Sequence, residues 1–446
     1  MIKERENEGR TIVRRQKENP ECLARGCLEE LQLKELKKVS ERVYHKVPFY
    51  KEAFRANGVK PEDIKNLKDL RRIPFTTRED LRARYPYGFL ASPLSSLVRL
   101  HTSTGTTGKP KAVLFSQKDI DQAAQLIIRS IRMTGAGPED VFQNMMSYGL
   151  FTGGLIFHYG AERAGLLVIP GGAGNTERQI GLMRDFSTTI LHLTPSYALY
   201  LAEVMERLGL NPRDDFDLRI FYLGAEPYSE ATKRKIEEIF SVDAYDSYGL
   251  SEMNGPGVAF ECKQKEGMHL WEDNFIMEII DPETLETQRE GEEGELVLSA
   301  INREAMPLLR YRTGDLTSIY PEPCKCGRIH RRISRIKGRV DDMFVLRGVN
   351  IFPSGVERVL MGLPEVGRNY QIILERKGGL DEMRVRVEVE KRFFRGSFQG
   401  LEKLQSDIKA KLKRELLVTP QVELVEPTTL PRTTGKAKRF IDNRQI

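Results

Sequence analysis

The sequence predicts an α/β protein: a large N-terminal domain of parallel, helix-covered sheets that includes a β-rich subdomain, and a small α+β C-terminal domain. Three observations predict this class. Short apolar runs alternate with amphipathic stretches between residues 165 and 239, and strand-like runs without long helices follow residue 255. From residue 343 onward, three strand-like runs precede one amphipathic stretch. Alternation at this spacing is typical of parallel sheets covered by helices. A chain of 446 residues has room for roughly two to four domains.

The single elements follow from the spacing of apolar residues. Residues 28–43 are expected to form a helix, because apolar side chains recur there at helical intervals. The strands expected next are 98–102, 165–170, 189–193, 218–223, 275–280 and 295–299, and the helices are 118–133, 177–186, 197–208 and 230–239. Beyond a boundary near 340–342, strands are expected at 343–346, 370–375 and 385–390. A helix follows, with Leu401, Leu404, Ile408, Leu412 and Leu416 on one face.

These elements give the expected domain limits. Residues 1–25 are an N-terminal extension, whose first 20 residues are charged and without periodicity. Residues 26–340 form the N-terminal domain, with the β-rich subdomain at about 256–340. Residues 341–446 form the C-terminal domain, whose size of roughly 100 residues is common for a domain.

Composition excludes several classes of protein. With 40% apolar and 30% charged residues and a net charge of +6, the chain has the composition of a soluble globular protein rather than a disordered one. The sequence lacks the run of about 18 apolar residues that a membrane span needs. It also lacks the apolar segment near the start that a standard secretion signal needs, so neither is expected. The five cysteines Cys22, Cys27, Cys262, Cys324 and Cys326 are too few for a disulfide scaffold. We therefore expect a cytoplasmic protein.

The positive charge is concentrated in the C-terminal region. Residues 342–446 hold 20 Lys and Arg against 14 Asp and Glu, and the rest of the chain is neutral. The basic residues alternate with acidic ones and form no basic block with interleaved aromatics, so a polyanionic small molecule is a better partner than nucleic acid. No nucleic-acid or membrane partner is expected, and a homodimer remains open.

A glycine-rich loop follows the strand expected at 98–102. It consists of Ser103, Thr104, Gly105, Thr106, Thr107, Gly108 and Lys109, and continues as Pro110 and Lys111. Small, hydroxylated residues and glycines let the backbone approach an anion closely, so that N–H groups and hydroxyls cradle phosphate oxygens. The loop is not a Walker A motif, because only two residues separate its glycines and proline follows Lys109.

This loop closely resembles the phosphate loop of the adenylate-forming superfamily of acyl-CoA synthetases, adenylation domains and luciferases. Five further motifs resemble that superfamily in the same order: Gly224-Ala-Glu-Pro227, Asp246-Ser-Tyr-Gly-Leu-Ser-Glu252, Tyr311-Arg-Thr-Gly-Asp315, Gly338-Arg-Val-Asp-Asp342 and Pro431-Arg-Thr-Thr-Gly-Lys436. Six motifs in the family's order leave little room for coincidence.

Other segments resemble the phenylacetate–CoA ligase family in particular. They are V-P-F-Y-K at 47–51, I-P-F-T-T at 73–77, Y-G-L-F-T-G-G at 148–154, H-Y-G-A-E-R at 158–163, Y-G-L-S-E-M-N-G-P-G-V-A at 248–259 and R-G-V-N-I-F-P at 347–353. Two positions depart from that family: the loop begins Ser-Thr-Gly instead of Ser-Ser-Gly, and Thr313 precedes Gly314 and Asp315 as in the wider superfamily.

The resemblance implies an ATP site and a role for each motif. The residues implied in nucleotide binding, besides Ser103 to Lys109, are Gly224, Ala225, Glu226, Pro227, Asp246, Ser247, Tyr248, Gly249, Asp315 and Arg339. Tyr248 offers a flat face for adenine, and the Asp315 carboxylate can accept both ribose hydroxyls. Glu252 supplies an oxygen ligand for Mg²⁺. Lys436 can reach the carboxylate and the α-phosphate, where charge develops during adenylation.

The C-terminal motifs imply a second half-reaction with CoA. By resemblance Asp341 is the hinge about which a mobile C-terminal domain turns after adenylation, and Arg347 and Gly348 then border the CoA tunnel. The acid pocket must hold an aryl or apolar group, and glycines beside aromatic residues leave room for a ring. Its candidate residues are Tyr148, Phe151, Gly153, Gly154, Ala225 and Pro256.

Three cysteines and one histidine suggest a structural zinc site. Cys262 and His269 lie seven residues apart, and Cys324 and Cys326 follow about 55 residues later. Three thiolates and an imidazole can hold zinc tetrahedrally and tie two loops of the β-rich region. His330 could replace His269, and three free buried thiols are the alternative.

The sequence thus predicts an ATP-dependent acid–CoA ligase that adenylates a phenylacetate-like aryl acid and transfers the acyl group to CoA, with ATP, CoA, Mg²⁺ and zinc as cofactors. Two alternatives remain. One is an adenylyltransferase of the same superfamily that modifies a deazaflavin without CoA. The other is a nucleotide-binding regulator without turnover, against which the presence of Lys436, Glu252 and Asp315 argues.

Overall fold

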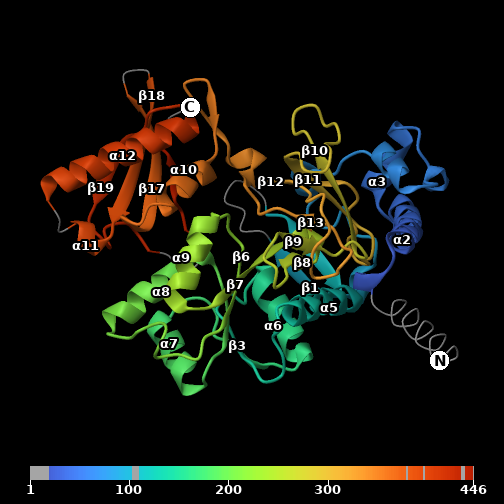
Figure 1. Cartoon of the computed structure of the whole chain (residues 1–446). Helices are drawn as coiled ribbons and strands as arrows, with labels where there is room; N and C mark the ends of the chain where they lie inside the picture. Colours follow the sequence, from blue (N-terminus) through green and yellow to red (C-terminus); the bar gives the residue numbers. More distant parts are fainter. Residues whose placement is uncertain (1–19, 103–109, 378–379, 395–396, 433–436, 445–446) are drawn as a thin grey trace, which may run out of the picture. The chain divides into compact units, whose positions relative to one another are not determined.

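The computed structural model describes residues 20–102, 110–377, 380–394, 397–432 and 437–444. The chain divides into two compact units (Figure 1). The first unit contains residues 1–139, 147–167 and 245–335, and the second contains residues 140–146, 168–244 and 336–446. No helix in the described ranges is long and apolar enough to cross a membrane.

The first unit contains most of the strands expected in the β-rich region. Its helices are α2 (Arg25–Lys46), α3 (Pro48–Ala56), α4 (Arg78–Ala83), α5 (Gln117–Met133) and α6 (Thr152–Ala164). Its strands are β1 (Leu97–Thr102), β2 (Ala112–Ser116), β7 (Asp243–Leu250), β8 (Gly255–Glu261), β9 (Met268–Leu270), β10 (Phe275–Ile280), β11 (Gly294–Ala300), β12 (Tyr311–Thr317) and β13 (Arg332–Ile333). Short 3₁₀ turns lie at Pro20–Cys22, Pro61–Asp63, Leu67–Arg72, Leu94–Ser96 and Ser251–Met253.

The pairing in this unit is antiparallel. Strands β1 and β2 form a hairpin, β7, β8, β9 and β13 follow one another, and β10, β11 and β12 form a separate layer. Helices α5 and α6 pack on each other and on β8. Helix α5 begins at Ser116, whose hydroxyl accepts the backbone N–H of Asp119 while the Asp119 carboxylate accepts that of Ser116. This capping box fixes the helix directly after β2.

The second unit begins with parallel strands covered by helices. Its N-terminal part contains β3 (Val141–Asn144), β4 (Leu167–Ile169), β5 (Ile190–Leu193), β6 (Ile220–Gly224), α7 (Thr176–Asp185), α8 (Pro195–Arg207) and α9 (Glu230–Phe240). Strand β5 pairs in parallel with both β3 and β6. The apolar faces of α8 and α9 pack with β5 and β6 in one buried cluster, which includes Leu201, Phe221 and Phe240.

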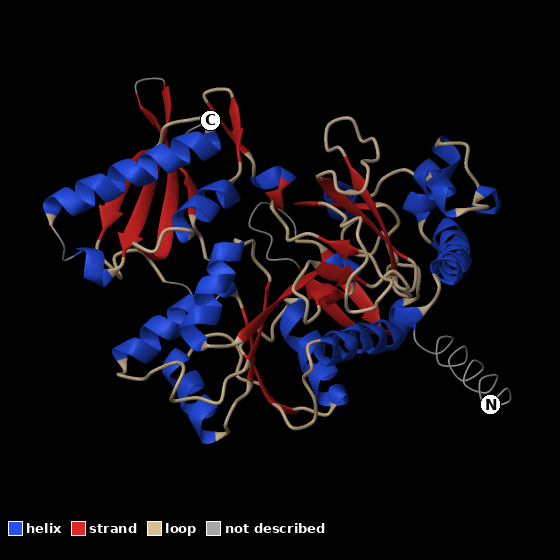
Figure 2. Cartoon of the chain, viewed as in Figure 1, coloured by secondary structure: helices blue, strands red, loops and turns tan. Residues whose placement is uncertain are grey.

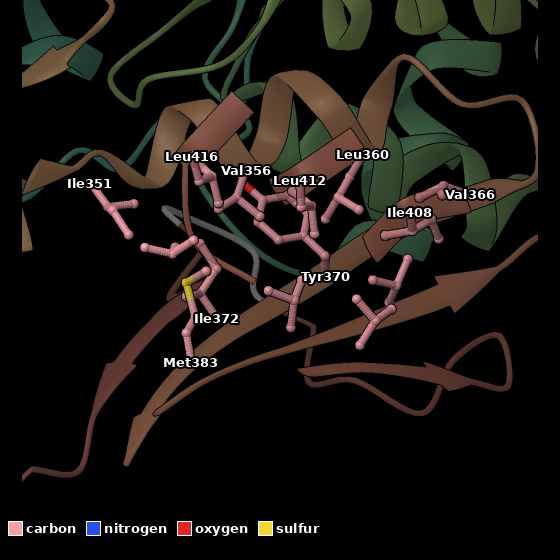
Figure 3. Close-up of a cluster of buried hydrophobic side chains, with 14 of the residues drawn as sticks. Ile351, Val356, Leu360, Val366, Tyr370, Ile372, Met383, Ile408, Leu412 and Leu416 are labelled. Atoms are coloured by element: carbon pink, nitrogen blue, oxygen red, sulfur yellow. The ribbon is translucent and has the colours of Figure 1, made fainter. Parts of the chain in front are cut away.

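The C-terminal part of this unit is an α+β fold (Figure 2). Its elements are β14 (Gly338–Arg339), a 3₁₀ turn at Val340–Asp342, β15 (Phe344–Leu346), β16 (Val349–Ile351), α10 (Pro353–Met361), β17 (Val366–Lys377), β18 (Leu380–Val389), α11 (Lys391–Phe394), α12 (Phe398–Leu416), β19 (Gln421–Val425) and β20 (Phe440–Asp442). The sheet order is β19-β18-β17-β20, and α10 and α12 pack against it. Their apolar side chains close a core drawn from residues 344–422, including Val356, Ile372 and Leu412 (Figure 3).

The predicted fold class is confirmed, and so are most of the expected elements. Helices α2, α5, α7, α8, α9 and α12 and strands β1, β4, β5, β6, β10, β11, β15, β17 and β18 lie where the patterns placed them, with ends shifted by a few residues. Helix α6 is the clearest addition. It starts at Thr152, and the apolar spacing predicted no element there; Gly153 and Gly154 in its first turn lower helix propensity. The N-terminal residues 1–19 lie outside the described ranges.

Candidate active site

The side chain of Glu252 lies at the centre of a buried polar cluster in the first unit. Glu252 belongs to the 3₁₀ turn that follows β7, and only 5% of its side chain is exposed. The Lys111 ammonium forms an ion pair with its Oε1, and the Tyr311 hydroxyl donates a hydrogen bond to the same oxygen over 3.0 Å. Burial alone would raise the pKa of Glu252, but Lys111 and Tyr311 lower it overall. The carboxylate is therefore ionised and suited to a cation.

The buried Arg303 holds together the two backbone segments that carry Lys111 and Glu252. The Arg303 guanidinium donates to the carbonyl of Glu252 and, over 3.1 Å, to the carbonyl of Leu114 in β2. It also lies 4.8 Å from the centre of the Phe115 ring. Arg303 thus connects the turn of Glu252 with the strand that starts after Lys111. Sequence reasoning did not single out Arg303 or assign roles to Lys111 and Tyr311, although Lys111 ends the glycine-rich loop and Tyr311 begins a quoted motif.

Tyr248 and Asp315 form a second buried pair in the same unit. The Tyr248 hydroxyl donates to Oδ2 of Asp315 over 2.6 Å, and the backbone N–H of Asp315 donates to the Thr313 hydroxyl. The structure therefore brings together the residues expected to meet adenine and ribose. Asp246 forms an ion pair of 2.8 Å with Arg335, two residues before Lys337 and Gly338 of the next motif.

Gly249 has a structural reason to be glycine. A Cβ atom there would collide with the carbonyl oxygen of Gly255 and with Pro256, because β7 and β8 approach closely at this point. Its neighbour Ser247 pairs with Phe260 in the same ladder. The predicted nucleotide contact of Gly249 and Ser247 stays a prediction.

The candidate acid-pocket residues of this unit surround the start of α6. Tyr148 and Phe151 precede the helix, and Gly153 and Gly154 are buried in its first turn. The room that Gly153 leaves is filled by the ring of Phe151 itself, which an added Cβ would hit. The expectation that Gly153 leaves space for a substrate ring stays a prediction. The Tyr148 hydroxyl lies 3.3 Å from Nδ1 of His158, one turn into α6.

In the second unit, Gly224 to Pro227 form the turn at the end of β6. Ala225 has a φ of 70°, a left-handed conformation that is uncommon for a residue with a Cβ. The Glu226 side chain is half-buried, and burial raises the pKa of its carboxyl. It accepts the backbone N–H of Ser196 over 2.7 Å and that of Ala437 over 3.1 Å. The Ser196 side chain and the positive charge of Arg439 also stabilise its ionised form. Sequence reasoning assigned Glu226 to the nucleotide, and that contact stays a prediction.

Arg347 and Gly348 form the tip of the hairpin between β15 and β16. Their φ values are 53° and 80°. A two-residue hairpin with both central φ values positive favours glycine, which explains Gly348. The same unit has a half-open pocket of about 830 Å³ whose lining includes Glu226, Asp341, Arg347, Gly348 and Arg439. Within the 3₁₀ turn at Val340–Asp342, the Asp341 carboxylate accepts a hydrogen bond of 2.9 Å from Arg339.

The cysteine cluster forms as the sequence suggested. One ligand atom from each of Cys262, His269, Cys324 and Cys326 lies within 4.8 Å of all the others. Nδ1 of His269 faces the carbonyl of His330 at 2.9 Å, which fixes the ring so that Nε2 points to Cys326 at 3.3 Å. The structure brings His269, and not the His330 side chain, to the three sulfur atoms. The Cys262 thiol lowers the pKa of Cys326.

Two groups of expected site residues, one nucleotide-binding and one catalytic, lie outside the described ranges. They are the phosphate-loop residues Ser103 to Lys109 and the lysine Lys436. Their roles stay predictions.

Comparison with known proteins agrees with the predicted resemblance. Residues 26–302 match the model of the AMP-binding enzyme family, and residues 348–444 match that of the AMP-binding enzyme C-terminal domain. The chain is 44% identical over 439 residues to a phenylacetate–coenzyme A ligase of Thermus thermophilus, covering 95% of this chain and 98% of that one. It is 41% identical to the phenylacetate–coenzyme A ligase of Escherichia coli, covering 94% and 95%.

Solved structures give the same result. The fold matches a 2-hydroxyisobutyryl-CoA ligase bound to an acyl-adenylate in its postadenylation state, with a TM-score of 0.89, 29% identity and coverage of 95% of this chain and 91% of the other. A structure of that ligase with CoA in its thioesterification state matches with a TM-score of 0.70, 30% identity and coverage of 96% and 92%. The matches confirm the prediction of an AMP-forming acid–CoA ligase. The chain belongs to the phenylacetate–coenzyme A ligase family of AMP-binding enzymes.

Proposed function

We propose that the enzyme adenylates phenylacetate or a close arylacetic acid with ATP and then transfers the acyl group to CoA. The observation that carries the proposal is the ionised, buried Glu252 with Lys111 and Tyr311 around it. It supports a site where a carboxylate holds a metal and a cation faces phosphate oxygens. Relatives named phenylacetate–coenzyme A ligase share more than two fifths of their residues with this chain over almost its whole length.

Glu252 is the residue proposed to hold Mg²⁺. When bound, the ion would neutralise charge on the phosphates of ATP and on the leaving pyrophosphate. A carboxylate is the ligand that this ion prefers, and Glu252 is kept ionised by its surroundings. The Tyr311 hydroxyl holds the Glu252 side chain in place, and the hydrogen bond from Arg303 to the Glu252 carbonyl holds its backbone.

Tyr248 and Asp315 are the residues proposed to hold adenosine. The Tyr248 ring offers a stacking face, and the hydrogen bond between the two side chains fixes the carboxylate beside it. Ser103 to Lys109 would bind the phosphates, with Gly224 to Pro227, Asp246 to Gly249 and Arg339 completing the nucleotide site. Lys436 would meet the α-phosphate and the acid carboxylate.

The remaining assignments concern the acid, CoA and zinc. Tyr148, Phe151, Gly153, Gly154, Ala225 and Pro256 are proposed to border the acid, and Arg347 and Gly348 are proposed to border the pantetheine of CoA. Cys262, His269, Cys324 and Cys326 fit a zinc ion in residue type, number and spacing. The contact of His269 Nδ1 with the backbone carbonyl of His330 is one that zinc-binding histidines commonly make. The reaction would take place in the cytoplasm, where thiols such as those of Cys22 and Cys27 stay reduced.

The test is pyrophosphate release from ATP with a panel of acids, with and without CoA. Phenylacetate should give the highest kcat/KM, benzoate and an aliphatic acid of similar size should give lower values, and CoA should be consumed to form a thioester. Transfer of AMP to a phenolic hydroxyl of a deazaflavin, with no CoA thioester, would instead establish the adenylyltransferase. ATP binding without pyrophosphate release from any acid would establish the regulator.

A further inference from the structure

Arg432, the second residue of the lysine motif at residues 431–436, uses every N–H group of its guanidinium in a hydrogen bond. It lies four residues before Lys436. Its Nε and Nη2 donate to the Glu203 carboxylate over 2.7 and 3.0 Å, and its Nη1 and Nη2 donate to the Glu388 carboxylate over 2.8 Å each. Nη1 also donates to the carbonyl of Leu430 over 2.8 Å. The five N–H groups of the guanidinium thus have five acceptors.

The two carboxylates belong to different parts of the second unit. Glu388 ends β18, inside the α+β fold that contains Arg432, and it also accepts the backbone N–H of Leu430 over 2.8 Å. Glu203 lies on α8, in the N-terminal part of the unit, and also accepts a hydrogen bond from Asn369 over 3.2 Å. If the C-terminal domain turns about Asp341, Glu388 moves with Arg432 and Glu203 stays behind.

The ion pair between Arg432 and Glu203 is partly buried, which strengthens it but still lets it open. The exposed fractions of the side chains are 15% for Arg432, 18% for Glu203 and 3% for Glu388. Bidentate bonds between charged groups are stronger than neutral ones. Burial raises the pKa of Glu203 even with Arg432 beside it. Both Glu203 and Arg432 keep contact with solvent, so water can replace each partner when the pair opens.

The other end of the lysine motif is held as well. Ala437, directly after Lys436, donates its backbone N–H to Glu226 at the end of β6. Glu203 and Glu226 thus hold the residues on both sides of segment 433–436, and both acceptors belong to the N-terminal part of the unit. Positioning at two ends is what a reacting side chain on a glycine-containing loop requires.

We propose that the bidentate pair between Glu203 and Arg432, here named the α8 latch, positions the lysine motif for adenylation and opens for the CoA step. The proposal rests on the proposed function, because it takes Lys436 to act in adenylation. Arg432 and Glu203 are positioning residues: they act through Lys436 and touch no substrate. Glu388 keeps Arg432 oriented within its own domain while the latch is open.

One helical turn further along α8, a second ion pair provides a matched control. Glu206 accepts hydrogen bonds from Arg368, one of them over 3.2 Å. This pair also joins α8 to the C-terminal part of the unit, but Arg368 lies in β17, far along the chain from the lysine motif. Glu203→Gln and Glu206→Gln therefore remove the same charge from the same helix, and only the first touches the latch.

The experiment measures the two half-reactions separately in single-turnover assays of the full-length enzyme. Adenylation is followed from ATP and acid, and thioester formation from supplied acyl-adenylate and CoA. Loss of a hydrogen bond to a charged group predicts that Glu203→Gln slows adenylation on the order of tenfold to a hundredfold. Its affinity for ATP and its rate of thioester formation should match the unmodified enzyme, and Glu206→Gln should leave both rates unchanged.

A conservative variant separates positioning from folding. Arg432→Lys keeps the charge but loses the planar fork, so adenylation should fall less than in Arg432→Gln. In the double variant of Glu203→Gln and Arg432→Gln, the loss should be smaller than the product of the single losses, because both remove one contact. Melting temperatures of all variants should lie close to that of Glu206→Gln.

Two results would overturn the latch. One is unchanged adenylation in Glu203→Gln, and the other is an equal loss of both half-reactions. The same assays on Lys436→Ala distinguish this failure from failure of the proposed function. If Lys436→Ala slows adenylation and Glu203→Gln does not, only the latch is wrong. If neither slows adenylation, the role of Lys436 is wrong, and the latch falls with it.

Discussion

The C-terminal domain is held together by apolar side chains, whereas its contacts with helices α8 and α9 are mostly polar, although Ala231 of α9 packs against its core. Its core, drawn from residues 344–422, is built from side chains such as Val356, Ile372, Met383 and Leu412 (Figure 3). Toward α8 it presents Arg432, as described above, and toward α9 it presents Glu357. The Glu357 carboxylate accepts the Thr232 hydroxyl over 2.7 Å and the Ser229 backbone N–H over 3.1 Å.

This difference indicates which contacts stay closed and which can open. Removing a buried aliphatic side chain from water contributes about 1.5–3 kcal/mol, and the gain is lost whenever a core opens. A neutral hydrogen bond contributes only about 0.5–1.5 kcal/mol net, and one to a charged group about 1.5–3 kcal/mol, because water replaces each partner on opening. A domain with an apolar core and polar outer contacts can therefore leave one docking site and take another while staying folded. Substitutions in the core, in the lysine motif, at the cysteine cluster and at the hinge test this difference.

The largest effect is expected in the core. Leu412→Ala should lower stability by about 2–5 kcal/mol, because it leaves a cavity between α12 and the sheet. Leu401, on the same helix but only partly buried, gives the matched control, and Leu401→Ala should cost clearly less. Differential scanning calorimetry measures both. Near the lowered melting temperature, both half-reactions of Leu412→Ala should decline together, and a selective loss of one would contradict the comparison.

The next largest effect is expected at the lysine motif. Lys436→Ala should slow adenylation by about 10²–10³-fold, since removal of one electrostatic contact to a developing charge typically has that effect. Thioester formation from supplied acyl-adenylate should be largely kept. Lys438→Ala, two residues along at an exposed position, serves as the control and should change neither rate. If thioester formation falls as far as the overall reaction, Lys436 has been given the wrong role.

A smaller effect is expected at the cysteine cluster. Metal analysis of protein purified without chelator should find about one zinc per chain, as a closed four-ligand site requires. Stripping the metal should lower the melting temperature while leaving the ratio of the two half-reaction rates unchanged. Cys22→Ser, at an exposed cysteine outside the cluster, should keep the zinc, and Cys324→Ser should lose it. Protein without zinc would show that the four residues are free side chains.

The sequence predicts the parts of this molecule whose chemistry is local. Apolar spacing predicts α5 and α12, and residue type alone groups Cys262, Cys324 and Cys326. The choice between His269 and His330 depends on the pairing of β9 with β13, in which His269 faces Arg332, and that pairing is a tertiary fact.

Contacts between distant charged residues could not be predicted in the same way. Glu203 and Arg432 are 229 residues apart, and Lys111 and Glu252 are 141 apart. Many lysines, arginines and glutamates compete for such pairings on sequence alone. Arg303 illustrates the limit best, because its partners are backbone carbonyls, which carry no signal in the residue types.

The smallest effect is expected at the hinge. Asp341→Pro fixes φ at a residue that should change conformation when the domain turns. Adenylation should survive better than thioester formation, because the arrangement that binds ATP forms before the turn. Asp342→Pro, at the next residue, tests whether the position matters. A fully active Asp341→Pro enzyme would place the hinge elsewhere, and equal loss of both steps would mean that the proline disrupts the junction.

The ratio of the two half-reaction rates, measured side by side in Glu203→Gln and Asp341→Pro, tests the account most directly. A latch that holds the adenylation arrangement and a hinge that leaves it must act in opposite senses. The rate of adenylation divided by that of thioester formation should therefore fall in Glu203→Gln and rise in Asp341→Pro, relative to the unmodified enzyme. If the ratio moves in the same direction in both variants, or in neither, the division into a stable core and a polar, reversible docking contact is contradicted.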